Sequence, residues 1–102
     1  MAIAAVSVVP IGTDSTSVSS YVAGAEKILR ADDRVTYQLG PMFTTIQGDL
    51  EACLDVIRKM HESLFVAGAL RVSTSIKIDD RRDRPGDMRA KVKSVEDKLG
   101  SP

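Results

Sequence analysis

The order of hydrophobic patterns along the chain is the feature that most constrains its fold. A nearly continuous β-rich run, Ile3–Val9, comes first, and the polar residues 14–17 after it are expected to cap a helix. That helix has an apolar stripe: Val18, Tyr21, Val22, Ala25, Ile28 and Leu29. The next four segments are two alternating runs, a second helical pattern and a fourth β-rich run: Val35–Leu39, Met42–Gln47, Leu50–Phe65 and Leu70–Ile78. A last, charged helix is predicted over Met88–Leu99.

Strand, helix, strand, strand, helix, strand is the split βαβ order. We therefore predict an α+β fold, a ferredoxin-like βαββαβ sandwich with an extra C-terminal helix. Both helices of this fold cover one face of the sheet, and the first and third strands are central. The bare face of a chain with a small core predicts self-association as a dimer or tetramer. On the first helix, Glu26 and Arg30 have the spacing of a favourable surface ion pair.

The length and composition indicate the number of domains, the location of the protein and the partners that it lacks. A length of 102 residues predicts one domain, spanning residues 1–102. The formal net charge is zero, so no domain-wide positive field attracts nucleic acid or an anionic membrane. No apolar run approaches the roughly 20 residues of a membrane-spanning helix. Because Cys53 is the one cysteine, an internal disulfide is excluded. We expect a cytoplasmic protein with neither a nucleic-acid nor a membrane partner.

Side chains alternate across each strand, so the pattern also predicts which residues reach the bare face. That set combines short hydroxyls, an amide and one ring: Ser7, Val9, Phe43, Thr45, Gln47, Ser73, Ser75 and Lys77. Hydroxyl and amide groups beside an aromatic ring suit a small polar ligand. Ser and Thr are also common on exposed or oligomer-facing strands, so the same face fits assembly without a ligand.

The sequence shows no catalytic motif. It lacks a nucleophile elbow, an H-E-x-x-H motif and paired cysteines. Asp79, Asp80 and Asp83 alternate with arginines, which predicts a self-paired loop and not a metal site. His61 lies at the edge of the second helical stripe, either as a boundary residue or as a ligand or proton-transfer group. Cys53 fits the core. We predict no enzyme activity, no catalytic residue, no metal and no cofactor.

Several segments resemble the small thiamine-binding protein family. They are Val6–Thr13 with Ser15 and Ser17, Pro41–Gly48, His61–Glu62 and Thr74–Asp83. The resemblance covers nearly the whole chain. It implies the ferredoxin-like fold, binding of thiamine or its hydroxymethylpyrimidine half without known catalysis, and assembly as dimers or tetramers through the sheets. Phe43 and Gln47 depart from the family pattern, which commonly has Gly and Glu at these positions.

The resulting hypothesis is a cytoplasmic homo-oligomer that binds thiamine or a related pyrimidine. Its candidate ligand-binding residues are Ser7, Phe43, Thr44, Thr45, Gln47, His61, Ser75 and Lys77. Gln47 can meet the adjacent donor and acceptor of an aminopyrimidine, much as Gln meets adenine. Phe43 either stacks on the ligand or fills its pocket, and Lys77 suits a phosphorylated ligand or an ion pair between subunits.

Two alternatives stay open. The first is a regulatory or structural homo-oligomer that binds another small molecule, such as an amino acid, at subunit boundaries. The second is an enzyme of thiamine metabolism with His61 as its acid or base.

Overall fold

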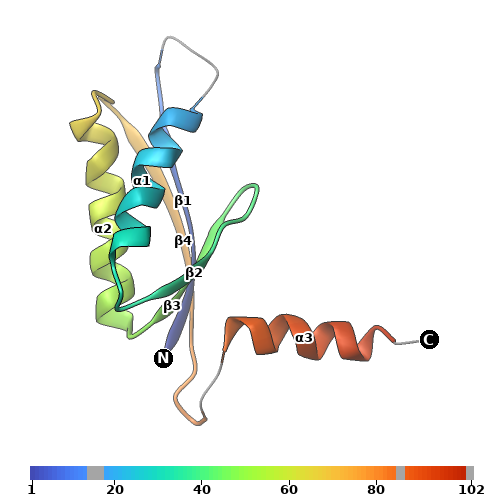
Figure 1. Cartoon of the computed structure of the whole chain (residues 1–102). Helices are drawn as coiled ribbons and strands as arrows, with labels where there is room; N and C mark the ends of the chain where they lie inside the picture. Colours follow the sequence, from blue (N-terminus) through green and yellow to red (C-terminus); the bar gives the residue numbers. More distant parts are fainter. Residues whose placement is uncertain (14–17, 85–86, 101–102) are drawn as a thin grey trace.

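The computed structural model describes residues 1–13, 18–84 and 87–100, so the expected helix-capping residues 14–17 lie outside the described residues. Its elements are β1 (Ala2–Pro10), α1 (Ser19–Ala31), β2 (Thr36–Gln38), β3 (Thr44–Gly48), α2 (Leu50–Val66), β4 (Val72–Asp80) and α3 (Met88–Lys98). The four strands form one antiparallel sheet in the order β2-β3-β1-β4. α1 and α2 lie side by side on one face, and α3 projects from the other (Figure 1). The predicted α+β, ferredoxin-like fold with an extra C-terminal helix is confirmed.

The central strand β1 is paired unequally with its two neighbours. β4 pairs with β1 along the whole length of both strands. β3 pairs only with Ala2–Val6, the first part of β1. The residues that follow, Ser7–Pro10, therefore have no partner strand on the β3 side, and the sheet has a notch there.

The hydrophobic core lies between the sheet and the two covering helices. Along β1, Val6 and Val8 are buried under the helices and Val9 is exposed on the other face, as the alternation predicts. The largest fully buried side chains are Leu29, Ile46, Met60, Leu64, Val6, Val56 and Cys53. Burying a side chain of Leu or Ile size stabilises the fold by about 1.5–3 kcal/mol relative to exposure. Among the described residues, none of the helices has the length and hydrophobicity that a bilayer crossing requires.

Three apolar side chains that alternate with the predicted bare-face residues, and should therefore face the core, are at least partly exposed. Ile76 and Ile78 are 45% and 42% exposed, although they pair with buried residues of β1 and so face the helix side. The reason is that β4 is an edge strand, and the covering helices leave its outer side open. Met42 is 79% exposed because β3 begins at Thr44, which leaves Met42 in the β2–β3 connection.

An ion-pair network joins the α1–β2 connection to α2. The guanidinium of Arg34 lies 2.7 Å from a carboxylate oxygen of Asp32 and 2.7 Å from one of Asp55. Asp55 also contacts Arg58 and Lys59 on its own helix. Hydrogen bonds from Arg34 lower the pKa of Asp32 to about 2. Arg34 is also the main reason why the pKa of Asp55 lies well below its ordinary value.

The network predicts a specific loss of stability in acid. Because the carboxyl pKa values are lowered in the folded state, the stabilisation is complete above the unfolded pKa of about 4 and is lost as the pH falls toward about 2. Asp55→Asn is expected to lower the free energy of unfolding at neutral pH and to make it less sensitive to pH in this acid range. Urea unfolding across the range measures both effects, with Glu62→Gln on the exposed side of α2 as the control. An acid response identical to that of the unmodified chain would contradict the assignment.

Candidate functional site

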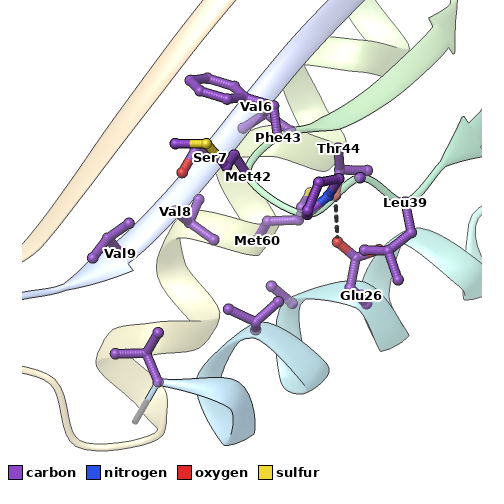
Figure 2. Close-up of a pocket in the computed structure, with 15 residues that line it drawn as sticks. Val6, Ser7, Val8, Val9, Glu26, Leu39, Met42, Phe43, Thr44 and Met60 are labelled. Carbon is purple, nitrogen blue, oxygen red and sulfur yellow. Dashed lines mark hydrogen bonds between the residues drawn. The ribbon is translucent and has the colours of Figure 1, made fainter. Parts of the chain in front are cut away.

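The notch beside the second half of β1 opens into a pocket of about 320 Å³. It lies between β1, α1 and the β2–β3 connection, and Figure 2 shows side chains from these elements around one space. Its apolar walls include Val6, Val8, Val22, Leu39, Phe43 and Met60. The volume is at the lower end of the range for small-molecule sites, which are concave and mostly apolar with a few polar groups.

The β2–β3 connection forms the outer wall of this pocket. β2 and β3 pair up to Gln38 and Thr45, and the residues between them leave the ladder and border the pocket. Gly40 is required in this turn, because a Cβ there would collide with the backbone carbonyl oxygen of Phe43. The wall is thin, since Leu39 and Phe43 each contact the pocket yet remain exposed to solvent.

Glu26 brings a carboxylate into the apolar pocket from α1. Its Oε1 accepts a hydrogen bond of 2.7 Å from the hydroxyl of Thr44 at the start of β3 (dashed in Figure 2). Its Oε2 is buried and has no hydrogen-bond partner among the described residues. A buried acceptor without a donor costs free energy, and the cost is greatest for a charged group. The pocket is therefore chemically suited to a ligand that presents an N–H donor or a positive charge.

The structure separates the predicted ligand-binding residues into three places. Ser7, Phe43 and Thr44 line the pocket. The bare face of the sheet holds four others, which are Thr45, Gln47, Ser75 and Lys77. His61 lies on α2, where its Nδ1 is 2.6 Å from the hydroxyl oxygen of Thr74 on β4. Its ring meets the edge of Phe65, with the ring centroids 5.4 Å apart, so it occupies a boundary position outside the described pocket lining.

Gln47 already has a hydrogen-bond partner within the chain. Its Oε1 accepts a hydrogen bond of 2.6 Å from the backbone N–H of Met88, and the side chains of both residues are buried. The amide that the sequence offered for a pyrimidine thus supports the start of α3. The predicted self-pairing of the acidic loop is confirmed for Asp83 with Arg81 and for Asp80 with Arg82, whereas Asp79 pairs with Lys91 of α3.

Glu26 is the polar residue of the pocket lining that sequence reasoning missed. The spacing to Arg30 predicted a surface ion pair, but Arg30 instead lies 3.5 Å from the hydroxyl of Tyr37. A signal was present in the sequence, because Glu26 follows Val22 by four residues and precedes Leu29 by three. A carboxylate within an apolar helical stripe indicates either a buried partner or a ligand.

The fold and the pocket together define a small α+β protein with a carboxylate in a mostly apolar pocket. A family model described as thiamine-binding protein matches residues 4–96. The chain belongs to this family.

Relatives and solved structures agree with that membership. The chain is 48% identical over 98 residues to the UPF0045 protein YqgV of Bacillus subtilis, with 93% of this chain and 94% of that protein covered. It is 42% identical over 100 residues to a UPF0045 protein of Methanothermobacter thermautotrophicus, with coverages of 97% and 100%. The crystal structure of the hypothetical protein MJ1052 from Methanocaldococcus jannaschii superposes with a TM-score of 0.84 at 30% identity, covering 93% of this chain and 95% of that one. A domain of unknown function, DUF77, from Bacillus cereus gives 0.83 at 33% identity, with coverages of 95% and 91%.

Two glycine substitutions test how the pocket wall is built. Gly40→Ala must displace the backbone at Phe43 and is expected to destabilise the fold by about 1–3 kcal/mol, as overpacking does. Gly24→Ala is the matched control, because its new methyl group meets no atom within 4 Å and lies in the helix α1. That change is expected to stabilise by about 0.5–1 kcal/mol. Urea unfolding compares the two, and a neutral effect of Gly40→Ala would show that the turn does not need glycine.

Proposed function

We propose that the protein binds thiamine, or its hydroxymethylpyrimidine half, in the pocket beside β1. In this proposal it acts without catalysis, as a cytoplasmic homo-oligomer. The observation that carries the proposal is the buried, unpartnered Oε2 of Glu26 inside an apolar pocket, in a chain of the thiamine-binding family.

The chemistry of thiamine matches the groups in the pocket. Its aminopyrimidine has an exocyclic amino group that donates hydrogen bonds, and its thiazolium ring carries a positive charge. The carboxylate of Glu26 accepts the first and attracts the second, and hydrogen bonds to an ionised acceptor are the stronger kind. Thr44 holds the carboxylate in place through Oε1, which leaves Oε2 for the ligand.

The other residues that line the pocket are suited to contact the two rings of thiamine. The faces of a planar ligand contact the apolar walls, and Phe43 is placed to stack on one of them. The hydroxyl of Ser7 can donate to a ring nitrogen. Gln47 lacks the charge that the family pattern has at its position, and in this proposal Glu26 supplies the carboxylate that balances the ligand. In this proposal Glu26, and not Gln47, makes the hydrogen bond to the aminopyrimidine.

Two features support the non-catalytic, self-associating parts of the proposal. Within the described pocket lining Glu26 is the one ionisable side chain, so an acid and a base are not brought together there. The sheet also keeps one face without covering helices (Figure 1), and hydrophobic residues such as Val9 are exposed on it.

Removing the charge of Glu26 is the decisive variant. Glu26→Gln keeps the shape and an acceptor for Thr44 but cannot attract a cation as the carboxylate does. We expect calorimetric titration to show thiamine affinity reduced about 10- to 100-fold, the loss of one hydrogen bond to a charged group. The variant should unfold at the same temperature or higher, since it relieves a buried charge. Glu62→Gln serves as the control.

The titration series also separates the alternatives. Hydroxymethylpyrimidine and thiamine phosphates distinguish the part of the ligand that is recognised. Amino acids test the regulatory alternative, because an ammonium group would also suit the free oxygen of Glu26. Equal thiamine affinity of Glu26→Gln and the unmodified chain would overturn the proposed site, and no thiamine binding by either would overturn the proposed ligand.

A further inference from the structure

The helix α3 is fixed to the sheet at its first turn and free beyond it. The side chain of Met88 is buried, and its backbone N–H donates to Gln47 on the bare face. The ammonium of Lys91 contacts the carboxylate of Asp79 on β4. From this root the helix runs away from the sheet (Figure 1). The direction of α3 is therefore set by contacts of its first turns with the sheet, although most of the helix does not touch the sheet.

An exposed apolar stripe runs along this free part. Val92, Val95 and Leu99 are 52%, 58% and 79% exposed. Together with Met88 they have the spacing four, three, four, which is the narrow seam of a helix pair. α3 has 11 residues, and isolated helices of this length are marginal in water. The helix thus presents a seam that requires a partner.

The stripe is complementary to a reversed copy of itself. Reading the spacing backwards gives the same order, so in an antiparallel pair Val92 meets Val95 of the partner subunit, twice by symmetry. Leu99 of the partner subunit then reaches the root of α3 beside Met88, because a helix of 11 residues is about 16 Å long. The two domains lie at opposite ends of such a pair.

The charges beside the stripe favour the same arrangement. Arg89 and Glu96 lie on one flank of the stripe, seven residues apart, and neither has an ion pair in the described part of the chain. In an antiparallel pair Arg89 faces Glu96 of the partner subunit at both ends of the seam. On the other flank Lys91 faces Lys98 of the partner subunit, and the contact of Lys91 with Asp79 offsets the repulsion between these two like charges.

We propose that α3 pairs antiparallel with α3 of a second copy of this chain and so links two sheets through their bare faces. This inference rests on the self-association in the proposed function and names the surface that produces it. It does not depend on the identity of the ligand.

Disulfide trapping tests the pairing and its direction. Chains with Val92→Cys and with Val95→Cys are mixed at micromolar concentration and oxidised mildly, with tags of different size. We expect the mixed disulfide to exceed either homodimeric disulfide at least about fivefold, because the antiparallel register joins position 92 to position 95. The native Cys53 is buried and does not compete. A mixture of Lys93→Cys and Val95→Cys is the control, since Lys93 lies on the outer side of the helix.

Charge exchange tests the flank independently. Arg89→Glu and Glu96→Arg each place like charges together and should raise the dissociation constant in sedimentation equilibrium about 5- to 10-fold, while the double exchange restores it. Lys93→Glu, with the same charge change as Arg89→Glu but on the outer side, should leave the dissociation constant unchanged.

Homodimeric disulfides would overturn the antiparallel register, and an oligomer with no disulfide and no charge effect would overturn the helix pair. A monomer throughout would overturn the pair and the proposed self-association together.

Discussion

The unequal pairing of β1 with its two neighbours determines the rest of the structure. β4 satisfies one edge of β1 along its whole length, whereas β3 ends its pairing at Val6. Along the remaining edge, Ser7, Val8 and Val9 therefore line the pocket and do not pair with another strand on that side. A sheet edge in the interior of a fold must be covered, and here α1 and the β2–β3 connection form the cover. The pocket is the space that this cover does not fill.

Glu26 gives this space its chemical character. An apolar pocket of the same size would attract any small hydrophobic molecule, but a carboxylate with one bonded and one free oxygen selects for a donor or a cation. The side chain of Glu26 is held by Thr44, which is the first residue of β3 and pairs with Val6 of β1. The register of the strands and the selection of the ligand therefore depend on the same residue. The opposite face of the sheet has a separate role in this account, because Gln47 there positions α3 for contact between copies.

Periodicity predicted the elements and the two faces of the sheet well, since alternation and helical spacing are local properties of the chain. Periodicity did not predict the exposure of side chains where that exposure depends on how far the neighbouring strands and helices extend. Ile76 and Ile78 face the predicted side but lie on an edge strand whose outer side is open. The predicted ligand-binding residues are also divided, because Ser7, Phe43 and Thr44 line the pocket while Thr45, Gln47, Ser75 and Lys77 lie on the bare face. Two contacts decided this outcome, Thr44 with Glu26 and Gln47 with Met88. They join residues 18 and 41 positions apart, which no local pattern reveals.

The central claim is that one carboxylate in the notch beside β1 recognises the ligand. A crystal structure of the protein with bound thiamine tests it most directly, because it shows the position and the contacts of each ring. We expect the aminopyrimidine in the pocket, with its amino group within about 3 Å of Oε2 of Glu26, the usual length of such a hydrogen bond. Thiamine bound on the bare face beside Thr45 and Ser75, with Oε2 of Glu26 untouched, would contradict it.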